Sequence, residues 1–368
     1  AITEAYCELE LARTVKEAGA SKFFDKHSTG GVGDKLSLTV LPLAAAAGAK
    51  IRKLSGTSLL HCGGTIDKLS SLKGFRHVSD LGALTEESDE FGFSIGRTSP
   101  DFCAGDNLTY RVRNMVGAVS SPDLIAASIM SKKIATSPAG LVLDVKVGPG
   151  SLFSSESQAI ETAQAMLEIA RSRELPTRVV LTEMSSPIGR AIGGVAEVRE
   201  ALAFLNLDSS TEDLQILSIA LASHLVEMAT NCSYAQAEAK VKEVWKRGAA
   251  FHLFSKWLRH RGVEEDALQF ANIKGHEIRA PFSAWIESID AKTVGQITSE
   301  IVAQGNGNCG DITILHGVGE YVEKGEVIAH LEAAEGGMDQ AISSLSSAIR
   351  YTDDAPCRRH PIQKILSN

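Results

Sequence analysis

A short glycine-rich stretch carries the densest chemistry in this sequence. Residues 25–35 read Asp-Lys-His-Ser-Thr-Gly-Gly-Val-Gly-Asp-Lys and follow the apolar pair Phe23-Phe24. Glycines let a backbone approach a ligand closely, and successive N–H groups, hydroxyls and a lysine ammonium suit the oxygens of a phosphate. The stretch therefore predicts a site for a small anion, with a glycine-rich surface turn as the alternative.

Two familiar phosphate motifs do not fit this stretch. A P-loop needs four residues between its first glycine and Gly-Lys-Ser/Thr, whereas Lys35 follows Gly33-Asp34. A dinucleotide fingerprint needs a third glycine where the chain has Leu36. These mismatches argue against nucleotide hydrolysis and against nicotinamide redox chemistry.

Composition narrows the class of protein. A chain of 368 residues exceeds what one hydrophobic core usually supports, so we expect two or three domains. A net charge of −8 argues against a nucleic-acid partner, and the lack of any run of 18 apolar residues argues against a membrane partner. The cysteines show no CxxC or metal-ligand spacing, so we expect reduced thiols, a cytoplasmic protein and no metal site; they are Cys7, Cys62, Cys103, Cys232, Cys309 and Cys357.

The elements that must position the glycine-rich stretch alternate along the chain. Continuous apolar runs predict buried parallel strands at residues 51–54, 141–147 and 179–183. Helical patterns occupy residues 2–18, 38–49, 156–173, 193–205 and 212–229. The helix at 38–49 would direct its positive N-terminal end at a bound anion. This alternation predicts an α/β fold with a mostly parallel sheet, and glycine-punctuated short strands after about residue 270 predict a further, mostly β region.

Further motifs follow in a fixed order and carry a resemblance. They are Ser55-Gly56, His61-Cys62-Gly63-Gly64-Thr65-Ile66-Asp67-Lys68-Leu69, Tyr110-Arg111-Val112-Arg113, residues 124–133, Leu143-Asp144-Val145-Lys146-Val147-Gly148 and residues 319–326. Together with residues 25–35, they resemble the thymidine and pyrimidine-nucleoside phosphorylases, the second structural class of nucleoside phosphorylases. The resemblance covers nearly the whole chain and is strongest between residues 25 and 200.

The resemblance implies a division into domains. Residues 1–20 and 104–137 would form a small helical domain that binds the base, and residues 21–103 and 138–270 a larger α/β domain that binds phosphate. Residues 271–368 would form a C-terminal α+β region. The active site would lie between the two half-sites, and domain closure would exclude water from it.

The resemblance also assigns phosphate ligands, all of them hydrogen-bond donors. They are Lys26, Ser28, Ser37, Ser55 and Thr65. The structural alternatives are helix caps for Ser37 and Thr65 and an ordinary turn residue for Ser55.

The implied base ligands are Arg113, Ser128 and Lys132, flanked by the apolar residues Leu59, Val119 and Ile125. On a helix, Ser128 and Lys132 share a face and can reach one ligand edge. Without the resemblance, the three apolar residues would be interpreted as core. We interpret Lys133 as part of a solvated basic face.

The resemblance implies reversible phosphorolysis of a pyrimidine nucleoside, in which phosphate attacks C1′ as the bond to the base loosens. Arg113 and Lys132 suit the stabilisation of negative charge on the leaving base. His27 could hydrogen-bond or protonate a pyrimidine carbonyl, because its unperturbed pKa is about 6.5, although a structural histidine is the alternative. Asp144 and Lys146 should share one face of a strand, and we assign them no catalytic role.

The chain departs from the resembled family at specific positions. Most members read Ser-Gly-Arg-Gly-Leu-Gly-His-Thr-Gly-Gly, whereas residues 55–64 carry Thr57, Ser58 and Leu60 in place of an arginine and two glycines. Asn114 replaces an aspartate, and we hypothesise that the replaced arginine and aspartate form an ion pair in relatives. These changes leave the preference among thymidine, uridine and deoxyuridine open, and they motivate the alternative of a non-catalytic or altered-specificity binding homologue.

Partners and cofactors follow from the same resemblance. Phosphate is a co-substrate and no organic cofactor is expected, while the monovalent cation that some members hold near the phosphate loop is not established by this sequence. A homodimer is expected, although only 24 residues precede the Asp-Lys-His-Ser motif. A phosphoribosyltransferase is the other candidate enzyme, but the sequence shows no matching pyrophosphate and metal pattern.

Overall fold

A central sheet organises the protein. The computed structural model describes residues 22–56, 63–98, 121–264, 275–304, 310–332 and 338–368, with the single residues Thr3, Val112 and Met115. Its six-stranded sheet has the order β13-β5-β4-β1-β2-β3. The strands are β1 (Phe24–Ser28), β2 (Ile51–Ser55), β3 (Phe93–Arg97), β4 (Gly140–Val147), β5 (Thr177–Glu183) and β13 (Ile362–Ser367). Strands β1 to β5 run parallel and β13 pairs antiparallel with β5, which confirms a mostly parallel sheet.

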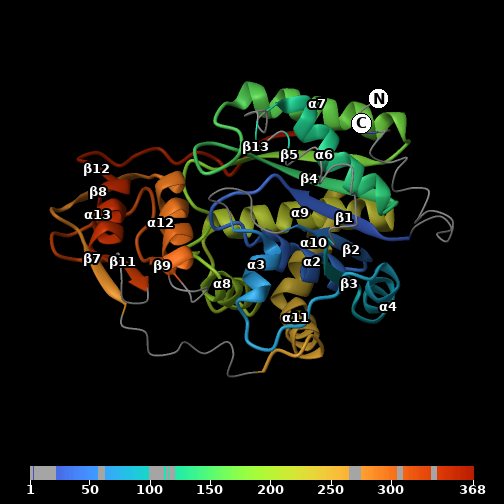
Figure 1. The fold of residues 1–368 in the computed structure, drawn as a ribbon, viewed down its shortest axis with the longest axis horizontal. Coiled ribbons are helices and arrows are strands. Elements are labelled where there is room, and N and C mark those ends of the chain that lie inside the picture. Colours follow the sequence, from blue (N-terminus) through green and yellow to red (C-terminus); the bar gives the residue numbers. More distant parts are fainter. Residues whose placement is uncertain are drawn as a thin grey trace.

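Helices cover both faces of this sheet (Figure 1). Helices α6 (Pro122–Ala135) and α7 (Glu156–Ser172) lie on one face, and α2 (Leu36–Ala46) and α9 (Glu212–Thr230) lie on the other. The remaining helices of this part of the chain are α3 (Thr65–Ser70), α4 (Leu81–Phe91), α8 (Val195–Leu205), α10 (Tyr234–Lys246) and α11 (Ala249–His260). The sheet is therefore the middle layer of three, as parallel strands require.

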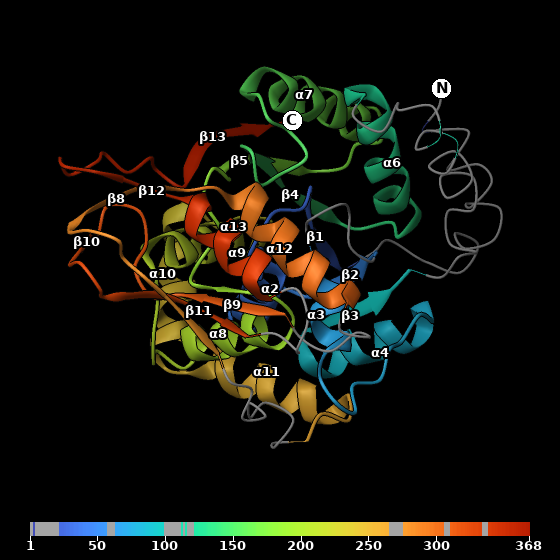
Figure 2. The same ribbon diagram turned by 60° about the vertical axis from the view of Figure 1, so that its left-hand side comes forward.

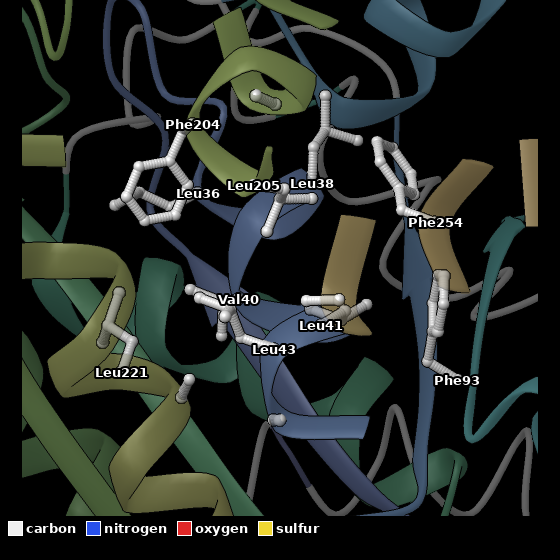
Figure 3. Close-up of a cluster of buried hydrophobic side chains, with 14 of the residues drawn as sticks. Leu36, Leu38, Val40, Leu41, Leu43, Phe93, Phe204, Leu205, Leu221 and Phe254 are labelled. Carbon is white, nitrogen blue, oxygen red and sulfur yellow. The ribbon is translucent and has the colours of Figure 1, made fainter. Parts of the chain in front are cut away.

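Two hydrophobic cores hold these layers together. One surrounds α2, whose residues 36–44 are all buried, because α8, α9 and α11 pack around it. Figure 3 shows Leu36, Leu38 and Val40 of α2 near side chains from α8, α9, α11 and β3. The second core joins α6 and α7 to β4 and β5. The glycine-rich stretch before α2 is thereby anchored to a buried helix.

The C-terminal region has its own hydrophobic core and antiparallel sheets. It lies beside the central sheet in Figure 1 and in front of it in the turned view of Figure 2. One sheet has the order β10-β8-β12 and the other β6-β9-β11-β7. The elements are β6 (Ala191–Ile192), β7 (His276–Arg279), β8 (Ala284–Ile289), α12 (Ala291–Gln304), β9 (Asp311–Ile314), β10 (Tyr321–Val322), β11 (Val327–Glu332), α13 (Met338–Ala348) and β12 (Ile349–Thr352). Strand β6 ties this region to the α/β part of the chain.

Most predicted elements are confirmed within a few residues. The predicted strands correspond to β2, β4 and β5, and the predicted helices after residue 37 correspond to α2, α7, α8 and α9. The helix predicted at residues 2–18 lies outside the described residues, and the division into domains stays a prediction. The pairing of β13 with β5 was not predicted. None of the helices in the described ranges combines the length and apolar character needed to cross a bilayer.

Candidate active site

The first four residues of the glycine-rich stretch belong to β1, and residues 29–35 form the turn between β1 and α2, at the carboxyl edge of the sheet. Gly30 and Gly33 have positive φ angles of 92° and 71°, a conformation that favours glycine. A Cβ atom on Gly33 would lie 2.6 Å from the Ile188 carbonyl oxygen. Glycine is needed there because the turn packs directly against the backbone of residue 188.

Two lysine ammonium groups meet beside this turn and define what we call the Lys26–Lys146 pair. Lys26 on β1 and Lys146 on β4 are fully buried, with Nζ atoms 3.3 Å and 2.8 Å from Oδ2 of Asp144. Neither Nζ atom makes a hydrogen bond to a described residue. Buried charged groups are normally both paired and hydrogen-bonded, so the pair has donor capacity for an anionic ligand. The Asp144–Lys146 contact confirms that these two side chains share a face.

A carboxylate organises the inside of the turn. Asp34 accepts hydrogen bonds from the Ser28 hydroxyl at 2.5 Å and from the Leu36 N–H at 3.2 Å, while the Gly30 N–H donates to Ser28 Oγ. Burial would raise the pKa of Asp34, but the ammonium groups of Lys146, Lys26 and Lys68 hold it well below its usual range. Asp34 is therefore ionised and fixes the turn that presents Ser28.

The other implied phosphate ligands lie at the start of helices or the end of a strand. Ser37 is buried in the first turn of α2, and Thr65 is the first residue of α3. The N-cap residues are Lys35 for α2 and Gly64 for α3, so neither hydroxyl is a cap. Ser55 ends β2, next in the sheet to β1. The capping alternative for Ser37 and Thr65 is thus wrong, and their assignment as ligands stays a prediction.

His27 lies on β1 among several cations. Burial, followed by Lys133, Lys53, Lys132 and Lys26, lowers its pKa well below the ordinary value. The imidazole is therefore neutral near pH 7, with one nitrogen that donates a hydrogen bond and one that accepts. This charge state favours a hydrogen-bonding role over proton donation.

Helix α6 brings Ser128 and Lys132 together. The Lys132 ammonium donates to the hydroxyl of Ser128 at 3.1 Å and to its carbonyl oxygen at 3.2 Å. The expectation that these side chains share a helix face is confirmed. Ile125, one turn earlier, is buried in the core with β4 and α7, where it packs as the residue-based interpretation expected.

The interpretation of Lys133 as a solvated residue is wrong. Its side chain is 2% exposed, and its Nζ atom lies 2.8 Å from Asp25 Oδ2 and 3.0 Å from the Leu54 carbonyl oxygen. The position faces the sheet because α6 packs its inner face against β4. Lys133 therefore joins α6 to β1 and β2 by a buried ion pair.

Two further lysines near the turn were not assigned from the sequence. Lys53 on β2 donates to the Lys26 carbonyl oxygen at 2.6 Å, and burial followed by the Lys133 ammonium lowers its pKa to about 7. Lys68 on α3 contacts the Asp34 carbonyl oxygen at 3.1 Å and Glu197 Oε2 at 3.2 Å. The signal for Lys53 in the sequence was a lysine inside an apolar run that predicts a strand, since fully buried lysines are rare unless paired. Lys68 lies on a helix and has no such signal.

Several predicted site residues lie outside the described residues. They are Arg113, Leu59 and Val119 of the base-binding set, and Thr57, Ser58, Leu60 and Asn114 of the departures from the family pattern. The hypothesis of a lost ion pair at positions 57 and 114 therefore stays a prediction. Within the described ranges, no three His, Cys, Asp or Glu side chains gather as a metal-binding group.

Comparisons with known proteins agree with the motifs. A family model described as the a/b domain of a glycosyl transferase family matches residues 20–251. The pyrimidine-nucleoside phosphorylase of Bacillus subtilis is 36% identical over 357 residues, covering 90% of this chain and 79% of that protein. The Staphylococcus epidermidis protein of the same name is 34% identical over 354 residues, covering 92% and 81%.

A solved structure shows a similar fold. The crystal structure of anthranilate phosphoribosyltransferase from Thermus thermophilus has a TM-score of 0.50 and 17% identity, covering 65% of this chain and 78% of that one. At that identity the likeness concerns the fold alone. The family is shown by the curated relatives and the family model, and both agree with the resemblance carried by the motifs. This chain belongs to the pyrimidine-nucleoside phosphorylase family of glycosyl transferases.

Proposed function

We propose that this protein catalyses the reversible phosphorolysis of pyrimidine nucleosides. A phosphate oxygen forms a bond to C1′ of the sugar while the bond from C1′ to the base nitrogen breaks, and the bonding electrons leave with the base. The products are a free pyrimidine and a pentose 1-phosphate. The Lys26–Lys146 pair carries this proposal, because its ammonium groups are paired with the Asp144 carboxylate but make no hydrogen bond to a described residue.

The phosphate is held at the carboxyl edge of β1 and β4 in this proposal. The Lys26–Lys146 pair provides charge, and the hydroxyls of Ser28, Ser37, Ser55 and Thr65 complete the ligand set. To donate to phosphate, the Ser28 hydroxyl gives up its hydrogen bond to Asp34. A phosphate dianion that replaces part of the Asp144 contact would give both ammonium groups the hydrogen bonds they lack. Fixed cations in a buried site stabilise an anion far better than mobile water does, and positioning two reactants together removes much of the entropic barrier.

The leaving base is bound from the α6 side. Lys132 and Arg113 stabilise the negative charge that develops on the pyrimidine, and Ser128 holds Lys132 by the hydrogen bond described above. Neutral His27 donates a hydrogen bond to a pyrimidine carbonyl oxygen. This assignment uses the lowered pKa of His27, since an imidazole that is neutral at pH 7 is a poor proton donor but still a hydrogen-bond donor.

The proposed function also includes a homodimeric state and a preference among pyrimidine nucleosides, and both can be tested. The resemblance implies a homodimer, which light scattering coupled to gel filtration tests directly. The altered residues 57, 58 and 60 motivate a comparison of thymidine, uridine and deoxyuridine in one assay. A binding-only homologue predicts that all three are bound and none is cleaved.

The first test measures chromatographic release of base from these three nucleosides, with and without phosphate. We expect release only with phosphate. Lys132→Ala should reduce kcat/KM by about 10²–10³-fold, the loss typical when one donor to a developing anion is removed. Lys50→Ala, which removes a lysine paired with Asp89 on the surface, is the matched control and should retain full activity.

Two results would contradict the proposal. Release at the same rate without phosphate indicates hydrolysis instead of phosphorolysis. No release from any pyrimidine nucleoside, by a chain that is folded by circular dichroism, supports the binding-only alternative.

A further inference from the structure

Lys35 is a buried cation that the proposed chemistry does not use. It is the last residue of the turn at residues 29–35, which we call the phosphate turn because the proposed function places phosphate there. It directly precedes α2 and follows Gly33-Asp34. Its side chain is 0% exposed. A fully buried ammonium needs a partner for each of its three donors, or its burial is strongly unfavourable.

Three oxygens surround the Lys35 ammonium, and we call them the oxygen cage. They are the carbonyl oxygens of Ile188 at 2.6 Å and Ala191 at 2.9 Å, and Glu200 Oε2 at 2.7 Å. The number of close oxygens equals the number of donors, so the ammonium is fully satisfied. Backbone carbonyls and a carboxylate are also ligands that replace the hydration shell of an alkali cation.

Hydrogen bonds that do not involve Lys35 hold the oxygen cage in place. Glu200 accepts hydrogen bonds from the N–H groups of Arg190 at 2.6 Å and Ala191 at 2.8 Å, which fix the segment that supplies the carbonyl oxygens. The Ile188 N–H donates to the Val32 carbonyl oxygen at 3.2 Å. The oxygen cage therefore lies in the segment that packs against Gly33. The Lys35 ammonium inside it joins the phosphate turn to β6 and α8.

The Lys35 ammonium inside the oxygen cage is charged at physiological pH. Burial alone would lower the pKa of Lys35, but the carboxylates of Glu200 and Glu197 raise it above the ordinary value. A second cation beside a permanent ammonium in a dry cage would be repelled. The residues around this part of the turn therefore do not fit an additional monovalent ion.

We propose that Lys35 is a tethered monovalent cation, which takes the place of a diffusible alkali ion and positions the phosphate turn. The inference rests on the proposed function in taking that turn as the phosphate site. It makes Lys35 a positioning residue, because its ammonium contacts protein oxygens only. The enzyme should then need no added potassium or sodium.

The wild-type chain provides the first test. Melting temperature and phosphorolysis rate are measured at equal ionic strength in potassium, sodium, ammonium and tetramethylammonium chloride. We expect both quantities to be independent of the cation, with rates within about twofold of one another. A potassium requirement, seen as loss of activity or stability in tetramethylammonium that potassium restores, would overturn the inference.

The second test removes the Lys35 ammonium from the oxygen cage. Lys35→Ala should lower the melting temperature and raise KM for phosphate at least tenfold with a smaller change in kcat. Potassium or ammonium chloride should partly restore both, whereas tetramethylammonium, which is too large for the space, should not. Lys35→Met keeps the space filled without charge, so it should show the same defects with no recovery by any cation.

The outcomes separate this inference from the proposed function. The melting temperature of Lys35→Ala against potassium concentration reports the cage even if the wild-type chain cleaves no nucleoside. Lys50→Ala serves as the exposed-lysine control and should show no cation effect. A Lys35→Ala chain with wild-type melting temperature and KM, or one that responds equally to potassium and tetramethylammonium, would contradict the proposal. If that variant is insoluble, the wild-type cation comparison decides alone.

Discussion

Two parts of the α/β region bury lysine side chains, and they differ in how the ammonium donors are used. At the oxygen cage and at the contact between α6 and β1, Lys35 and Lys133 have their donors directed at fixed carbonyl and carboxylate oxygens. At the carboxyl edge of β1 and β4, the Lys26–Lys146 pair shares one carboxylate and makes no hydrogen bond to a described residue. We propose that Lys35 and Lys133 hold the structure together, whereas the Lys26–Lys146 pair binds an anionic ligand.

The largest expected effect on stability comes from breaking a satisfied pair. Lys133→Ala leaves the buried Asp25 carboxylate without its cation, so unfolding in urea should show a loss of about 3–5 kcal/mol. The double variant Asp25→Asn/Lys133→Met removes both charges and should recover much of that loss, since neither member of the ion pair is left without the other. Equal stability of Lys133→Ala and wild type would mean that this lysine is not structural.

At the Lys26–Lys146 pair we expect a large loss of activity and only a small loss of stability. Lys146→Met should lower kcat/KM for phosphate by about 10²–10³-fold, the range seen when one anion-stabilising donor is removed. Its melting temperature should change much less than that of Lys133→Ala, because Asp144 keeps Lys26 and a hydrogen bond from Thr182 at 2.7 Å. A large loss of stability with unchanged kinetics would reverse the assignment of the two regions.

A smaller effect should appear in the pH dependence of stability. Lys53 has a pKa of about 7 in the folded chain against an ordinary value of 10.5. Between these values the unfolded chain binds more protons, so this group makes the free energy of unfolding rise as pH increases from about 7 to 10. Lys53→Met should flatten that rise in urea unfolding measured at pH 7, 8 and 9. An unchanged slope would show that Lys53 titrates normally.

The sequence predicted the parts of the fold that depend on local pattern. Apolar runs located β2, β4 and β5 within a few residues, whereas β1, which contains residues 25–28 of the glycine-rich stretch, was not predicted as a strand. The shared face of Ser128 and Lys132 followed from helix periodicity. These features depend on neighbours in the chain, so periodicity and residue type suffice to identify them.

Features that depend on long-range packing were missed. Lys133 was interpreted as solvated because its burial requires α6 to lie on β1 and β2, contacts that no local pattern encodes. Strand β13 pairs with β5 although the two strands lie about half the chain length apart in the sequence. Lys146 was given no role because the unsatisfied state of its ammonium is visible only when Lys26 and Asp144 are placed beside it.

Phosphate binding measured by isothermal titration calorimetry tests the central claim most directly. We predict that the wild-type chain binds inorganic phosphate, and that Lys146→Met binds it at least about tenfold more weakly, since a hydrogen bond to a charged group contributes about 1.5–3 kcal/mol. Lys50→Ala should bind phosphate as the wild type does. Equal affinity in Lys146→Met and wild type, or no phosphate binding by the folded wild-type chain, would contradict the assignment of the Lys26–Lys146 pair as the anion site.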